Sequence, residues 1–124
     1  MILTALSVAL GGAIGATLRW LTGLLTLRVM GQGFPWGTVT VNIAGSFLMG
    51  VLVVALADRG GLRAAPFLMT GLLGGFTTFS AFSLDAVALM ERGQFSLAVA
   101  YMGGSVVLGL AALVLGMGMT RVMI

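Results

Sequence analysis

Hydrogen-bond donors recur within otherwise apolar stretches of this chain. Asn42 carries a carboxamide, and Ser80 and Ser83 carry hydroxyls three residues apart. Tyr101 and Ser105 lie about one helical turn apart in a later stretch. N–H and O–H groups can replace part of the water around a small anion, because both present a positive hydrogen. The pattern therefore favours anion binding, although each group taken alone is explained as well by packing or by an interhelical hydrogen bond.

Asn42 is the donor that most needs a partner. Its side chain offers two N–H groups in surroundings of low dielectric constant, where an unpaired polar group is costly. Thr38 lies four residues before Asn42 and shares its helix face. Two interpretations stay open, which are an interhelical hydrogen bond and donation to an anion that passes along this face.

Two phenylalanines accompany the serine hydroxyls. Phe79 and Phe82 are three residues apart and so project from one helix face. Ser80 and Ser83 have the same spacing on the adjoining face. Ring packing alone would explain the phenylalanines, but the positive edge of a phenyl ring can also contact an anion without holding it tightly. These residues predict a pore wall of ring edges beside a track of hydroxyls.

Two charged residues fall inside apolar stretches. Arg19 is either a snorkelling side chain near the membrane surface, where the adjacent Trp20 is a typical anchor, or part of an electropositive vestibule for an anion. Asp85 is the only acid inside a stretch, and it either lies in a wet vestibule or pairs with an arginine.

The composition excludes several classes of function. The chain has no Cys and no His, which removes thiolate and imidazole chemistry, and no nucleophile with a base can be assembled, so we expect no enzyme. The six basic residues are dispersed despite a pI near 11.3, so no nucleic-acid partner is expected. A hydrophobic content of 60% and a mean hydropathy of +1.19 indicate an integral membrane protein surrounded by lipid.

The elements that must position these residues are membrane-spanning helices. A helix needs about 20 apolar residues to cross a bilayer. Four stretches are long enough, and they predict an all-α protein with one domain over residues 1–124 and spans at about 2–27, 37–57, 66–90 and 95–120.

The third span is predicted to break in mid-membrane. Residues 71–85 contain the pair Gly74-Gly75, followed at once by several hydroxyl residues. Non-helical backbone is tolerated at this depth only where protein buries it or a water-filled cavity solvates it. The glycine pair and the hydroxyl residues together are expected to interrupt the helix, and the segment therefore marks a binding site or a pore.

The distribution of arginines leaves the orientation of the chain almost undetermined. With an even number of spans both termini lie on one side, and the count is three against two: Arg59, Arg63 and Arg121 on one side, Arg28 and Arg92 on the other. A chain that inserts both ways can form an antiparallel pair, and four short helices enclose little space for permeation. We therefore expect an antiparallel, dual-topology homodimer.

Three motifs in order resemble the Fluc/CrcB fluoride channels, and the likeness covers all four spans. The motifs are GGAIGATLRW at 11–20, GTVTVNIAGSFLMG at 37–50 and GGFTTFS at 74–80. The resemblance implies a homodimer with two antiparallel pores in the inner membrane of a prokaryote. Fluoride would leave the cytoplasm passively through these pores, which protects the cell from its toxicity.

The resemblance also implies roles for individual residues. Asn42, Phe79, Phe82 and Ser105 would line the pore, with Tyr101 nearby. A structural sodium ion at the dimer centre would be held by the main-chain carbonyls of Gly74 and Thr77. Two departures stand out, because Ala81 replaces a common threonine and Asp85 a common glutamate.

Two rival functions come from other classes. A small dual-topology multidrug or cation transporter needs a mid-membrane carboxylate, yet the first span has no acid and Asp85 follows the predicted break. A purely structural membrane subunit would use its glycines for packing, but would leave Thr77 and Thr78 at the break unexplained.

Overall fold

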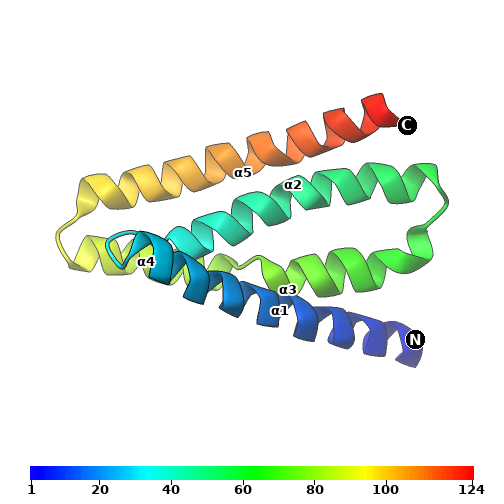
Figure 1. Cartoon of the computed structure of the whole chain (residues 1–124), viewed down its shortest axis with the longest axis horizontal. Coiled ribbons are helices and arrows are strands. Elements are labelled where there is room, and N and C mark those ends of the chain that lie inside the picture. Colours follow the sequence, from blue (N-terminus) through cyan, green and yellow to red (C-terminus); the bar gives the residue numbers. More distant parts are fainter.

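The computed structural model describes all 124 residues and is entirely helical (Figure 1). Its elements are α1 (Ile2–Met30), α2 (Trp36–Asp58), η1 (Leu62–Ala64), η2 (Pro66–Leu73), α3 (Gly74–Phe76), α4 (Phe79–Glu91) and α5 (Phe95–Met123). They form four segments long and apolar enough to cross a membrane, at Ile2–Met30, Trp36–Asp58, Leu62–Glu91 and Phe95–Met123.

Each helical segment runs a few residues beyond the predicted span. The prediction for α1 ended before Arg28, but the helix continues until Gly31, which has a φ of 80° and so ends it in a conformation that suits glycine. An arginine in the last turn also interacts favourably with the negative end of the helix dipole. Polar residues at a membrane surface therefore do not mark the end of a helix.

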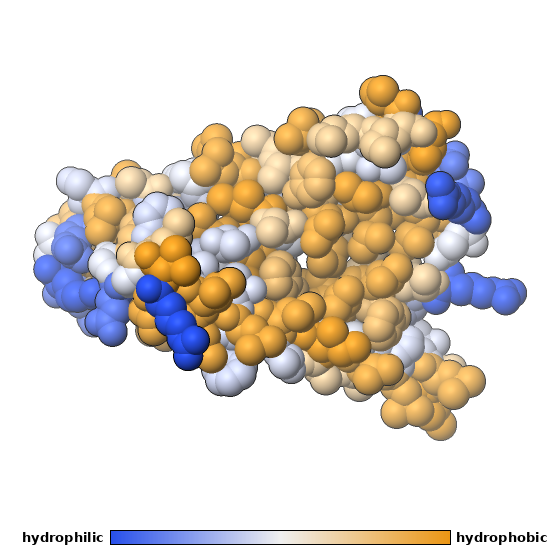
Figure 2. All heavy atoms as spheres, in the orientation of Figure 1, coloured by the Kyte–Doolittle hydropathy of each residue, from blue (hydrophilic) through white to orange (hydrophobic).

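Both termini lie at the same end of the bundle, with the α1–α2 and α4–α5 connections at the other (Figure 1). α2 packs along α5, and α1 packs along η2 and α3. Hydrophilic residues gather at the two ends, whereas hydrophobic atoms cover most of the length between them (Figure 2). Only 13 of the 124 residues are buried, so a single chain has a small core and exposes most of its apolar surface.

Glycines bring α1 close to the third segment. A Cβ added to Gly15 would collide with the carbonyl oxygen of Leu72, and one added to Gly75 would lie 2.6 Å from the carbonyl oxygen of Gly12. Such spacing of small residues lets helix backbones approach closely in a membrane. Gly75 therefore lets α1 and the third segment pack closely, although the sequence pattern had singled it out as part of the break.

The third segment does break, but after the glycine pair rather than at it. Gly74 and Gly75 are helical, whereas Thr77 (φ −83°, ψ 160°) and Thr78 (φ −153°, ψ 124°) are extended. The break falls within the predicted residues 71–85, but of the glycines and hydroxyl residues expected to interrupt the helix, only the two threonines leave it. The physical reason is that threonine hydroxyls offer the backbone other hydrogen bonds, and those of Thr77 and Thr78 bond to backbone groups here. The preceding η2 is π-helical, a rare form that often lies near functional sites.

Candidate functional site

Asn42 on α2 holds the extended peptide at the break. Its Oδ1 accepts a hydrogen bond from the backbone N–H of Thr78 at 2.8 Å, and its Nδ2 donates to the Thr78 carbonyl at 3.0 Å. The structure thus contains the hydrogen bonds from Asn42 to another segment that one of the two interpretations expected. One N–H of the carboxamide is not used by either bond and remains for another acceptor.

Thr78 was missed as a site residue in the sequence. Its hydroxyl accepts a hydrogen bond from the Ala81 N–H at 3.1 Å and so caps the start of α4. The signal was available, because a threonine just before an apolar helical stretch is a typical N-cap. Thr78 therefore both begins α4 and presents the peptide that Asn42 holds.

A cavity of about 220 Å³ lies beside the break. It brings together four predicted pore-lining residues and the predicted sodium ligand Thr77, and its lining is Asn42, Ser46, Thr77, Thr78, Phe79, Phe82, Ser105 and Val106. The Phe79 and Phe82 ring centroids are 5.7 Å apart. The hydroxyl oxygen of Ser105 is buried and has no hydrogen-bond partner. A buried donor without a partner is uncommon, and it can serve a ligand that occupies the cavity.

The other two predicted serines do not line this cavity. The Ser83 hydroxyl donates to the Phe79 carbonyl at 3.0 Å, within its own helix. Ser80 is exposed, and its hydroxyl lies 3.4 Å from that of Thr78. Both hydroxyls therefore point to neighbouring groups of α4 and its cap in the single chain.

Asp85 pairs with hydroxyls and not with an arginine. Its Oδ2 accepts hydrogen bonds from Thr38 at 2.7 Å and from Tyr101 at 3.1 Å. Tyr101 is 1% exposed, so this contact is buried on one side. Asp85 also lines two cavities, of about 340 Å³ and about 250 Å³. The pairing of Asp85 with an arginine, one of the two interpretations drawn from the sequence, does not occur here. Its place in two cavity walls is compatible with the other interpretation, a position in a vestibule.

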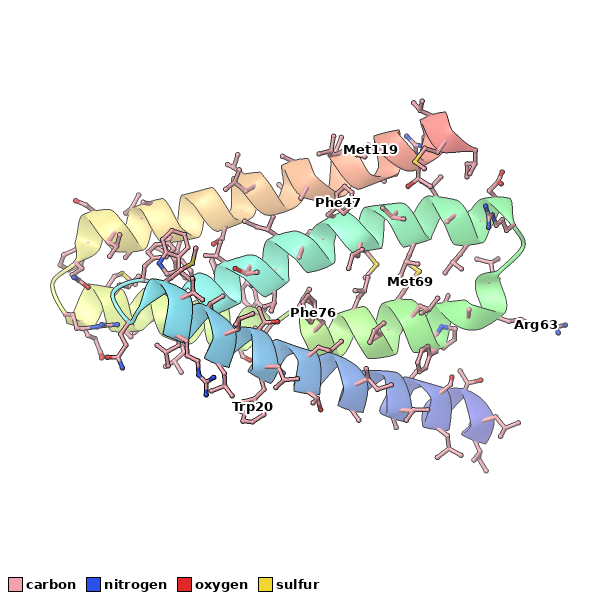
Figure 3. All side chains as sticks on the ribbon, viewed as in Figure 1. Trp20, Phe47, Arg63, Met69, Phe76 and Met119 are labelled. Carbon is pink, nitrogen blue, oxygen red and sulfur yellow. The ribbon has the colours of Figure 1, made fainter.

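Arg19 faces protein, while its neighbour faces outward. The Arg19 Nε donates to the carbonyl of Gly75 at 3.0 Å, and Arg19 lines the 250 Å³ cavity together with Asp85 and Thr38. Trp20 is 63% exposed and projects away from the bundle (Figure 3). Arg19 thus satisfies a carbonyl next to the break and places a positive charge in the wall of a cavity.

The three cavities share lining residues and so adjoin one another. The 340 Å³ cavity lies under the α1–α2 loop, with Arg92 in its wall, and shares Asp85 and Gly23 with the 250 Å³ cavity. The 250 Å³ cavity shares Thr78 with the 220 Å³ cavity at the break. The three cavities thus follow one another from the α1–α2 loop to the break, with Asp85 and Gly23 between the first two and Thr78 between the last two.

Two main-chain carbonyls at the break lose their usual helical partners. In a regular helix the Gly74 carbonyl would accept a hydrogen bond from the Thr78 N–H, but that N–H bonds to the Asn42 side chain. The Thr77 N–H, three residues after Gly74, bonds to the Leu73 carbonyl and so does not replace it. The Ala81 N–H, four residues after Thr77, bonds to the Thr78 hydroxyl. Gly74 is also exposed in the single chain. No cluster of His, Cys, Asp or Glu that could hold a metal occurs, and main-chain carbonyls such as these are oxygen ligands that suit a hard cation.

Comparison with known proteins gives consistent matches over nearly the whole chain. Residues 6–117 match the family model described as CrcB-like protein, Camphor Resistance (CrcB). A protein of Cereibacter sphaeroides named fluoride-specific ion channel FluC is 64% identical over 121 residues, which are 98% of this chain and 97% of the relative.

Two further relatives carry the same name. The protein of a Ruegeria species is 57% identical over 98% of this chain and 97% of its own length. The protein of Paracoccus denitrificans is 54% identical over 95% of this chain and 94% of its own length. With a family model that spans most of the chain and relatives this similar, the chain belongs to the CrcB family.

Proposed function

We propose that this chain forms a passive channel through which fluoride leaves the cytoplasm of a prokaryotic cell, across its inner membrane. The three relatives above are each named fluoride-specific ion channels, and each aligns over nearly its full length. Channels are not enzymes, in agreement with the lack of nucleophile and base in the sequence. A purely structural subunit or a multidrug transporter is not supported by membership of this family.

The observation that carries the proposal is the unpartnered Ser105 hydroxyl in the 220 Å³ cavity. The spare N–H of Asn42 and the rings of Phe79 and Phe82 belong to the same cavity. These groups offer positive hydrogens and ring edges, and no carboxylate lines the cavity. A small anion can exchange its water for several weak contacts of this kind and still leave again, which favours conduction over tight binding.

The outer part of the route suits the recruitment of an anion. Arg19 brings a positive charge to the 250 Å³ cavity, which raises the local concentration of anions. The Asp85 carboxylate in the same wall accepts two hydroxyl donors. Its negative charge is thereby partly offset, and Asp85 does not line the 220 Å³ cavity at the break.

A second copy of the chain would complete the site. Phe79 is 79% exposed and Gly74 is exposed, although both lie in the middle of a membrane-spanning segment. A carbonyl without a partner costs several kcal/mol in lipid, so another protein surface is needed there. The near tie in arginines between the two ends favours an antiparallel partner, because neither orientation is strongly preferred.

The same surface would hold a structural sodium ion. The carbonyls of Gly74 and Thr77 fit this role, because their usual helical donors are engaged elsewhere and a hard cation prefers oxygen ligands. A bound cation would supply a positive charge that offsets the exposed carbonyl dipoles. The residues of this chain would contribute main-chain oxygen only, with no charged side chain at the site.

Two substitutions in the 220 Å³ cavity test the proposal. Phe82→Ile keeps much of the volume but deletes the ring edge, and Asn42→Asp replaces N–H donors with a negative charge, so both should reduce fluoride efflux from liposomes severely. Thr40→Val on the same α2 helix is a matched control, because the Thr40 hydroxyl bonds only to the Trp36 carbonyl of its own helix. Parent-like efflux in both cavity variants would show that this cavity is not the pathway.

A further inference from the structure

Five aromatic rings form a continuous series from the α1–α2 loop to the helix break. Trp36 contacts Phe34 with ring centroids 4.7 Å apart, and Phe34 contacts Tyr101 at 5.5 Å. Tyr101 in turn contacts Phe82 at 5.2 Å, and Phe82 contacts Phe79 at 5.7 Å. The inner rings line the 220 Å³ cavity, whereas Phe34 lies in the loop that covers the 340 Å³ cavity. The series therefore joins a loop residue to the candidate pathway.

Phe34 contacts the buried Tyr101 ring and also lines the 340 Å³ cavity. The two rings meet nearly at right angles, at 83°, which is a favourable edge-to-face arrangement. Phe34 also packs on the buried cluster of Ala86, Leu89, Ala98 and Tyr101. The 340 Å³ cavity is lined by Phe34 itself and by Leu89 and Asp85. Without the Phe34 ring, the empty space beside Tyr101 would increase, and a ring with fewer contacts on one side is held less firmly.

The position of Tyr101 matters because its hydroxyl has one partner. It donates to Asp85 Oδ2 at 3.1 Å, and the same oxygen accepts from Thr38. A hydrogen bond weakens steeply when its donor moves out of line. A small tilt of the ring would therefore release the hydroxyl from Asp85 and shift the ring surface against Phe82.

We propose that Phe34 is a positioning residue for conduction, since it fixes the Tyr101 ring so that its hydroxyl stays on Asp85. The proposal rests on the proposed function for its effect on flux. It assigns a role to the α1–α2 loop, which otherwise only connects two spans. Phe34 acts through Tyr101 and does not itself line the cavity at the break.

A double-mutant cycle separates this role from a merely structural one. Phe34→Leu should lower fluoride efflux about tenfold, whereas Phe34→Trp, which keeps an aromatic ring, should stay within about twofold of the parent. In a Tyr101→Phe background the same Phe34→Leu change should have an effect below about twofold, because the hydroxyl is already absent. Phe95→Leu is the matched control, since Phe95 is 63% exposed at the start of α5 and lines none of the cavities described above.

A spectroscopic readout tests the positioning without any flux. Tyr101 is the only tyrosine, so the tyrosine Fermi doublet in a Raman spectrum reports its hydroxyl alone. Phe34→Leu should raise the ratio of the higher to the lower component, as expected when a tyrosine stops donating strongly to a carboxylate. Phe34→Trp and Phe95→Leu should leave the ratio as in the parent.

The results distinguish the two proposals. An unchanged doublet in Phe34→Leu, or an equal loss of efflux in the parent and Tyr101→Phe backgrounds, would overturn the role of Phe34. A parent protein that conducts no fluoride would refute the proposed function instead, and the Raman comparison would still decide whether Phe34 positions Tyr101.

Discussion

Replacing Asn42 by leucine should destabilise the fold at the helix break. The two side chains are similar in size, so the main loss is that of two hydrogen bonds, at 2.8 Å and 3.0 Å, to one peptide group. Each backbone group left unpaired in a partly buried place costs about 1 to 3 kcal/mol. Bonds between membrane helices average nearer about 0.6 kcal/mol, because the unfolded chain in the membrane finds other partners. We expect a loss of about 2 to 4 kcal/mol, between these limits.

The assay is reversible unfolding in mixed micelles, followed by far-UV circular dichroism. Thr40→Val on the same helix removes one hydroxyl that bonds within α2, and it should change the free energy of unfolding by less than about 0.5 kcal/mol. Asn42→Asp keeps the acceptor for the Thr78 N–H but loses the donor to its carbonyl, so its stability should fall between those of the parent and Asn42→Leu. If Asn42→Leu were as stable as Thr40→Val, the side chain would not hold the break.

Three further predictions concern the assembly and the packing. Single cysteines at Gly33, in the α1–α2 loop, and at Leu62, the first residue of η1 at the opposite end of the bundle, should each be labelled from both sides of a membrane. Labelling of each from one side only would contradict the antiparallel dimer. Replacement of sodium by a large organic cation should lower the unfolding temperature of the purified dimer, whereas no change would argue against the ion. Gly15→Ala should lower the free energy of unfolding by about 1 to 3 kcal/mol, because its Cβ would collide with the Leu72 carbonyl. Gly23→Val should lower flux and leave stability unchanged, because a Cβ at Gly23 meets nothing within 4 Å and the position lines two cavities. A stable Gly15→Ala variant together with an unstable Gly23→Val variant would refute this placement of the two glycines.

Apolar length and composition were sufficient to predict the helical class and the four spanning segments. The need of Asn42 for a polar partner was also predictable, because a carboxamide in an apolar span is costly without one. Its actual partner was not, since Thr78 lies 36 residues away and only the packing of α2 on the third segment brings them together. The break itself was expected, but it was assigned to the glycine pair as well as to the hydroxyl residues, whereas only Thr77 and Thr78 leave the helix.

The partners of the charged side chains could not be chosen from sequence alone. Asp85 could have met an arginine, and its two hydroxyl partners come from α2 and α5, which lie on either side of it in the chain. Likewise the contact of Phe34 with Tyr101 depends on how the α1–α2 loop folds over the end of α5. Such choices depend on tertiary packing, which local patterns do not specify.

The most direct test of the account is anion efflux from liposomes that contain the purified protein, with a potassium ionophore to balance charge. The cavity at the break offers weak donors and ring edges without a carboxylate, so vesicles loaded with fluoride should empty rapidly. Vesicles loaded with chloride should retain it. Chloride that escaped as quickly as fluoride, or fluoride retained as in protein-free vesicles, would contradict the central claim.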